Sequence, residues 1–137
     1  MKTRVNLLCL LFICGCARLN RDLTHTLPYD AMVGKTYVTQ EDFTIFKYRD
    51  SKTIMITYPD DSSRLFDSKI LGVLPKGSEL FLVKVIREGN FEIDYSVFYC
   101  QITASPDEAW IGKTVSPMGM ESSDGQGLFE SRYLEER

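Results

Sequence analysis

Alternating apolar and polar residues predict β-strands along most of the chain after residue 34. In the run 53–58 (TIMITY), Ile54, Ile56 and Tyr58 fall on one face of an extended chain. Similar runs, rich in aromatic and β-branched residues, predict further strands at 35–39, 43–48, 70–74, 79–87, 96–104 and 110–115. No run of helical spacing exceeds two turns before residue 120. The pattern therefore favours an all-β fold.

Turn-forming residues separate these runs. The cluster PDDSS at 59–63 predicts a solvated loop. The sequence Pro75-Lys76-Gly77 suits a type I turn with proline second and glycine fourth. Short strands joined by such turns are typical of sandwiches and barrels. We predict one small β domain over 34–137, a barrel or sandwich of about five to seven short antiparallel strands.

Two segments of this domain have distinctive patterns. The run 79–87 (ELFLVKVIR) is largely apolar on both faces, which predicts a central, bent strand. The tail ends as GLFESRYLEER, whose apolar spacing allows either a last strand or a short helix.

The N-terminus has the pattern of a targeting segment. Lys2 and Arg4 precede the run 5–13 (VNLLCLLFI), which is apolar except for Asn6. Nine helical residues span only about 13 Å, less than half of a ~30 Å hydrocarbon core. A buried core helix would have to begin at the first residue and end at once in polar sequence. A signal peptide is therefore favoured over both a transmembrane helix and a core helix.

The residues Ile13-Cys14-Gly15-Cys16 follow this apolar run and resemble the bacterial lipobox. The resemblance implies attachment of a diacylglyceryl group to the Cys16 thiol, cleavage before Cys16 by the lipoprotein signal peptidase, and N-acylation. Two or more acyl chains, at ~0.8 kcal/mol per buried CH₂, anchor a protein durably to a bilayer.

The lipobox also implies an address and a division of the chain. Lipoproteins retained in the inner membrane usually carry aspartate after the cysteine, whereas this chain has Ala17, which favours the outer membrane. We expect residues 1–15 to be the signal peptide. Residues 16–33 are expected to be the lipidated N-terminus and a flexible tether, because 17–30 is polar and mixed without a clear period.

The stretch 70–86, ILGVLPKGSELFLVKVI, resembles the bacterial Src-homology-3-like domains, which repeatedly show a strand, an LPKG-type turn and a hydrophobic strand. The resemblance covers about residues 33–115 and implies a small β-barrel.

The charge balance weighs against nucleic acid as a partner. The full chain has a formal net charge of -3. Without Lys2 and Arg4, 14 basic residues face 19 acidic ones, a net charge of -5. A nucleic-acid binder normally has a basic surplus or stripe, and the sequence shows neither.

The cysteines are accounted for one by one. Cys9 and Cys14 would leave with the signal peptide and Cys16 would carry lipid, so Cys100 would be alone and could form no intramolecular disulfide. In a strand, Phe98, Cys100 and Ile102 share an apolar face. We therefore predict a buried, inert thiol at Cys100, with a reactive or intermolecular thiol as the alternative.

Candidate chemistry is sparse. The only histidine, His25, lies in the expected tether and is predicted to be solvated rather than catalytic or metal-binding. Asp60 and Asp61 are adjacent in a turn cluster and are predicted to be solvated rather than paired for catalysis or for calcium. We predict no catalytic residues, no metal and no cofactor. The aromatic residues Tyr95, Phe98, Tyr99 and Trp110 are predicted to fill the core, with a ligand-binding patch as the alternative.

These observations lead to a functional expectation. Small all-β lipoproteins of this size commonly act as immunity proteins or inhibitors, so the resemblance favours a non-catalytic envelope lipoprotein that binds or inhibits a protein partner. The alternative is a structural or assembly component of a multi-protein envelope complex, such as a secretion machine. An enzyme is not expected, because nucleophile and base candidates are missing.

Overall fold

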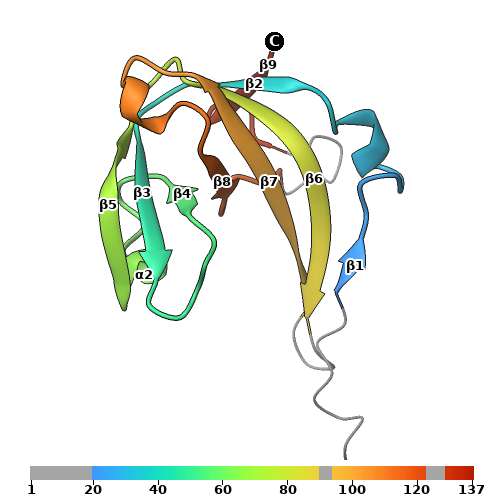
Figure 1. Ribbon diagram of the computed structural model, residues 1–137, viewed down its shortest axis with the longest axis horizontal. Helices are drawn as coiled ribbons and strands as arrows, with labels where there is room; N and C mark the ends of the chain where they lie inside the picture. Colours follow the sequence, from blue (N-terminus) through green and yellow to red (C-terminus); the bar gives the residue numbers. More distant parts are fainter. Residues whose placement is uncertain (1–19, 90–93, 123–128) are drawn as a thin grey trace, which may run out of the picture.

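The computed structural model describes residues 20–89, 94–122 and 129–137 (Figure 1). The described residues are mostly strands, which confirms the predicted all-β class. They form nine strands, one short α-helix and two 3₁₀ turns, in the order β1 (Arg21–Asp22), η2 (Tyr29–Ala31), β2 (Thr36–Thr39), β3 (Phe43–Tyr48), β4 (Met55–Thr57), α2 (Ser62–Leu65), β5 (Ser68–Leu74), β6 (Glu79–Gly89), β7 (Asp94–Ala104), η3 (Glu108–Trp110), β8 (Thr114–Pro117) and β9 (Leu134–Glu136).

The strands form one mixed sheet with two open ends. Its order is β5-β3-β4-β8-β7-β6-β2-β9, and β1 pairs with β6 off this path. All pairs are antiparallel except β4 and β8, which run parallel over two residue pairs. Of the two predicted arrangements, a barrel or a sandwich, the sandwich is confirmed, because β5 and β9 do not pair with each other and the sheet does not close. The prediction of five to seven short antiparallel strands fell short in number, and β6 and β7 have 11 residues each.

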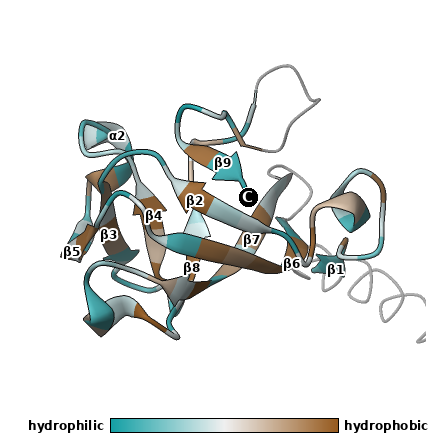
Figure 2. Cartoon of the chain, turned by 90° about the horizontal axis from the view of Figure 1, so that it is seen from above, coloured by the Kyte–Doolittle hydropathy of each residue, from teal (hydrophilic) through white to brown (hydrophobic). Residues whose placement is uncertain are grey.

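The sheet folds over into a sandwich-like arrangement with the core inside it. Strands β3, β4 and β5 lie on one side and the long, curved pair β6 and β7 on the other, with β8 between them (Figure 1). Brown, hydrophobic stretches mark strands on both sides in the view from above (Figure 2). The core side chains include Phe43, Ile45, Ile56, Leu74, Leu80, Leu82, Phe98, Ile102 and Val115.

A bulge in β6 explains why both faces of its sequence are apolar. The β6–β7 register shifts between Leu82 and Lys84. Leu80 and Leu82 are buried before the bulge, and Val85 is buried after it, whereas Val83 is exposed. One extra residue changes which alternate positions face the core. The feature predicted as a bend is thus a bulge, after which a different set of alternate residues faces the core.

The expected flexible tether is wrong from Arg21 onward, because this segment pairs with the sheet. Arg21 and Asp22 pair with β6, and the Leu23 backbone N–H donates to the Val85 carbonyl at 2.9 Å. Leu23 belongs to the hydrophobic core. On this side of β6, β2 pairs only with residues 79–81, and the segment 21–24 covers residues 85–87 of the same edge. Residues 16–19 lie outside the described residues.

The remaining local predictions have mixed outcomes. The turn at Pro75 is displaced by one residue, because Ser78 N–H bonds to the Pro75 carbonyl and Gly77 takes a φ of 84°. Glycine at the third position with positive φ is the requirement of a type II turn. The C-terminal tail, left open between helix and strand, ends in β9. No helix in the described part of the chain is long and apolar enough to cross a membrane.

The predicted burial of Cys100 is confirmed. Phe98, Cys100 and Ile102 all lie in the core cluster, and Gln101 on the opposite face is exposed. Cys100 is opposite Leu82 on β6 and Val115 on β8, so it lies at the centre of three strands. Burial raises the pKa of its thiol to about 12.

Candidate functional site

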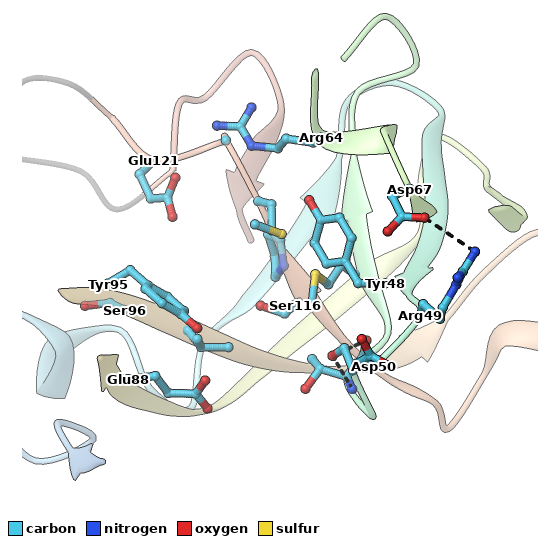
Figure 3. A pocket seen from close by; sticks show the side chains of 17 residues that line it. Tyr48, Arg49, Asp50, Arg64, Asp67, Glu88, Tyr95, Ser96, Ser116 and Glu121 are labelled. Atoms are coloured by element: carbon cyan, nitrogen blue, oxygen red, sulfur yellow. Dashed lines mark hydrogen bonds and ion pairs between the residues drawn. The ribbon is translucent and has the colours of Figure 1, made fainter. Parts of the chain in front are cut away.

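A cleft of about 570 Å³ opens on the described surface between the two sides of the folded sheet. Its walls come from the loop after β3, the helix α2 and the ends of β6, β7 and β8 (Figure 3). The Tyr48 ring lies near its middle and makes an edge contact with the buried Phe46, with ring centroids 5.4 Å apart. The lining residues include Tyr48, Arg49, Asp50, Arg64, Asp67, Glu88, Tyr95, Met118, Gly119 and Glu121.

Both arginines that line the cleft are paired with carboxylates. Arg49 lies 3.6 Å from Asp67, and Arg64 pairs with Asp61. The Glu88 carboxylate accepts a hydrogen bond of 3.1 Å from the Tyr99 hydroxyl. Since the positive charges are neutralised locally, the cleft offers an anionic ligand no free cation among its described lining residues.

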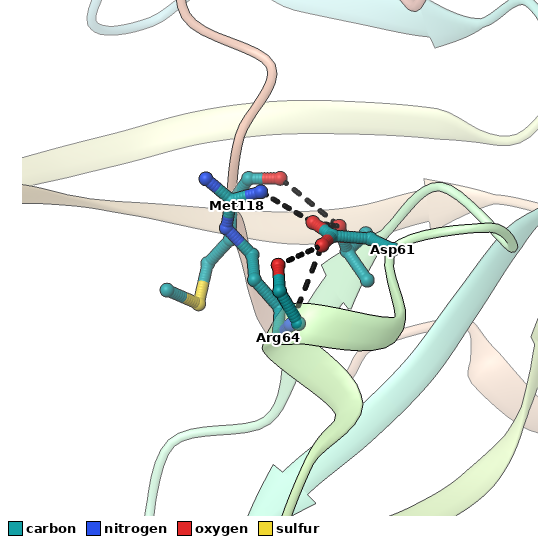
Figure 4. A network of polar contacts seen from close by, with 5 residues as sticks. Asp61, Arg64 and Met118 are labelled. Atoms are coloured by element: carbon teal, nitrogen blue, oxygen red, sulfur yellow. Dashed lines mark hydrogen bonds and ion pairs between the residues drawn. The ribbon is translucent and has the colours of Figure 1, made fainter.

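Asp61 is the centre of a polar network beside the cleft residues Arg64 and Met118 (Figure 4). It is the N-cap of α2, and its carboxylate accepts hydrogen bonds from the Ser63 hydroxyl at 2.7 Å and the Thr57 hydroxyl at 3.1 Å, besides the pair with Arg64. The Thr57 hydroxyl shares its single proton between this carboxylate and the Met118 carbonyl, which lies 3.4 Å from the hydroxyl oxygen. The network thus joins β4, α2 and the segment after β8 around one buried carboxylate.

The pKa of Asp61 reflects this setting. Burial acts to raise it, but the hydrogen bonds from Arg64, Ser63 and Thr57 outweigh burial and hold the pKa at about 2, below the ordinary 3.8. The predicted solvated turn is therefore wrong for Asp61, although Asp60 is exposed. Asp61 is buried because a short helix begins directly after it and needs a cap.

Beside the cleft, strand β5 forms one end of the sheet and carries an unusual amount of exposed apolar surface. The described chain exposes eight large hydrophobic side chains, and four of them lie within residues 66–73. Their exposed fractions are 82% for Phe66, 60% for Ile70, 37% for Leu71 and 52% for Val73. We call Phe66, Ile70, Leu71 and Val73 the β5 patch.

The inner side of β5 is tightly packed. A Cβ atom on Gly72 would lie 2.7 Å from the Trp110 indole ring, so only glycine allows this approach. Leu74 is fully buried in the core. The strand is therefore fixed in place while its outer residues stay exposed.

A basic groove lies beside the β5 patch. A hollow of about 330 Å³ is lined by Lys47, Tyr48, Arg49, Asp67, Ser68 and Lys69. Lys47 and Lys69 are directly opposite each other in the β3–β5 pair. Neither ammonium has a hydrogen-bond or ion-pair partner among the described residues. Like charges directly opposite across a strand pair are destabilising.

The residues singled out from sequence are spread over the molecule. Cys16 lies outside the described residues, and His25 is exposed on the segment before η2. Phe98 fills the core as predicted. Tyr95 does not, because it is 52% exposed and lines the cleft. Trp110 is partly buried over Gly72.

Sequence reasoning missed both the cleft and the basic groove. The lining residues of the cleft come from five separate segments, and no spacing within one segment predicts that they lie together. The one available signal was Lys69, directly before the predicted strand 70–74, where a charge adjoins apolar residues at a possible edge.

Within the described ranges, no group of three histidine, cysteine or carboxylate side chains is placed to hold a metal ion. Comparison of the chain with protein-family models, with curated proteins and with solved structures found no match.

Proposed function

We propose that this chain is a non-catalytic, lipid-anchored protein of the bacterial envelope that binds a protein partner, in the manner of an immunity protein or inhibitor. The lipobox at Ile13–Cys16 and the short apolar run before it support the lipid anchor on Cys16. Ala17 supports the outer membrane as its location.

The observation that carries the binding role is the β5 patch. Half of the exposed large hydrophobic side chains of the described chain lie in eight consecutive residues. Scattered apolar side chains are normal on a surface, whereas contiguous ones mark interaction sites. A protein partner is favoured over a small molecule because the patch is an exposed strand rather than an enclosed pocket.

The polar groups support a binding role rather than catalysis. The Cys100 thiol is buried in the core with a raised pKa, so it cannot meet a substrate. The strongly shifted carboxylate, Asp61, is engaged by Thr57, Ser63 and Arg64 in capping a helix. Its lowered pKa makes it a poor general base at neutral pH.

The full lipidated chain, purified in detergent with envelope extract, is expected to retain one protein in a fixed ratio. Changing Ile70 and Val73 together to serine is expected to lower its recovery by about tenfold, the equivalent of ~1.4 kcal/mol. Val83→Ser, at an exposed position on β6, serves as the control and is expected to change nothing. Recovery of no protein in a fixed ratio by the unaltered chain would contradict the proposed function.

A further inference from the structure

We infer that the outer edge of β5 binds an extended, acidic segment of the partner protein by strand addition. This inference rests on the proposed function and names the chemistry of the segment that would bind. Three features of β5 support it, namely the free edge, the apolar residues along that edge and the unpaired lysines beside it.

The backbone of β5 has an edge without a strand partner in the described part of the chain. Strand β5 pairs with β3 on one side, and no other described strand pairs with it. It has seven residues, whereas β9 at the opposite end of the sheet has three. An edge strand presents unpaired N–H and C=O groups that an extended peptide can satisfy.

The side chains along this edge are apolar and exposed. Ile70 and Val73 are each more than half exposed, and Phe66 lies just before the strand. Peptides that add to a sheet edge gain affinity from backbone hydrogen bonds and selectivity from alternate side chains. The β5 patch would contact apolar residues of the added strand.

The charges beside the edge predict that the bound segment is acidic. Lys47 and Lys69 repel each other across the β3–β5 pair, and Arg49 lines the same groove with Asp67 as the only described acid. The groove therefore has a net charge of +2 on a chain whose net charge is -3. A carboxylate of a bound segment would relieve the lysine repulsion and pair with both ammonium groups.

The same charges disfavour a second copy of this chain. A symmetric edge-to-edge dimer uses the same patch on both copies, so Lys47, Arg49 and Lys69 would meet their counterparts. The edge also has a register shift opposite Ile45 and Phe46, and it carries Lys69. Bulges and lysines on an edge discourage indiscriminate pairing, which favours one selected sequence over self-association.

The test titrates the full lipidated chain, in detergent micelles, against short fluorescent peptides and measures anisotropy. One peptide alternates valine with glutamate, a second alternates valine with lysine, and a third repeats the acidic sequence with every amide N-methylated. We expect the acidic peptide to bind at least about tenfold more tightly than either of the others. Its binding is expected to weaken as salt is raised, because exposed ion pairs are screened.

Paired variants show where the peptide binds. Changing Lys47 and Lys69 together to glutamate is expected to reverse the preference between the acidic and basic peptides. Changing both to glutamine is expected to remove the preference without adding repulsion. Lys52→Glu lies on the exposed loop between β3 and β4 and changes the net charge of the chain as much as either single Lys→Glu change does. It is expected to leave the preference unchanged.

Equal affinity for the acidic and basic peptides, or no effect of N-methylation, would overturn the inference. A dimer of the free chain in sedimentation experiments would also overturn it if Ile70→Ser and Val73→Ser together dissociated that dimer. A second copy would then cover the edge. The peptide titration does not depend on capture from the envelope. Peptide binding without any envelope partner would support this inference and overturn the proposed function. An envelope partner that the Ile70 and Val73 variant still retains would support the proposed function and overturn this inference.

Discussion

Replacement of Cys100 by aspartate is expected to unfold the domain. The Cys100 side chain is fully buried between Leu82 of β6 and Val115 of β8. A carboxylate there has no described cation beside it, and burial of an unpaired charge costs several kcal/mol or forces the group to stay protonated. Domains of this size are stable by about 5–15 kcal/mol, so such a cost removes much of the total. Far-ultraviolet circular dichroism during urea unfolding measures the loss.

Cys100→Ala is the matched control. It removes the sulfur and leaves the strand pairing intact, and it is expected to lower the free energy of unfolding by only about 1 kcal/mol. The unaltered protein should react with thiol reagents at Cys100 only after denaturant is added, because burial raises the pKa of the thiol to about 12. Rapid labelling of the folded protein at Cys100 would contradict this account of the core.

Replacement of Asp61 by alanine is expected to lower the free energy of unfolding by about 2–4 kcal/mol. The change removes the N-cap of α2 and the acceptor for the Thr57 hydroxyl. It also leaves Arg64 without its carboxylate, against the backbone of Gly119. Urea unfolding measures the change. Asp60→Ala, at the exposed neighbouring position, is expected to change stability by less than about 0.5 kcal/mol.

The pH dependence of stability separates the charge of Asp61 from its shape. A carboxyl group whose pKa is lower in the folded state stabilises the fold above its unfolded pKa, and this contribution is lost as pH falls through the folded pKa. For Asp61 the window runs from about 3.8 down to about 2 and is equivalent to roughly 2 kcal/mol. Asp61→Asn is expected to remove this pH dependence from the urea midpoint. An unchanged profile between these pH values would contradict the assigned network.

The local predictions from sequence succeeded where they depended only on the alternation of residues within one strand. The boundaries of β3 were predicted at both ends, and the alternation of Phe98, Cys100 and Ile102 correctly placed the thiol in the core. Period-two alternation depends only on which face of a strand is buried, so it can be read from a short segment.

The failures have a common physical cause, because each depends on a partner far away in sequence. The segment before η2 has no apolar period, yet Leu23 and Thr24 are held by Val85 on β6. Asp61 reads as a loop residue until Thr57 and Arg64 are seen around it. The choice between a barrel and a sandwich likewise depends on whether the end strands β5 and β9 meet, and no local sequence pattern predicts that.

The exposure of the β5 patch and the position of the basic groove also depend on contacts between distant segments. An exposed Ile70 or Val73 cannot be told from a buried one by composition, since both belong to a good strand sequence. Their exposure follows from the position of β5 at the end of the sheet. The cross-strand approach of Lys47 and Lys69 follows from the β3–β5 register and could not be predicted before the pairing was known.

Lipid attachment to Cys16 tests the central claim most directly. Cells that express the chain with a C-terminal affinity tag are grown with radioactive palmitate, and the isolated protein is examined for label and size. The account predicts a labelled protein shortened by the signal peptide. It also predicts that Cys16→Ser abolishes the label and leaves the full-length precursor, whereas Cys14→Ser, two residues earlier, keeps both label and cleavage. Label that persists in the Cys16→Ser variant, or its absence from the unaltered chain, would contradict the account.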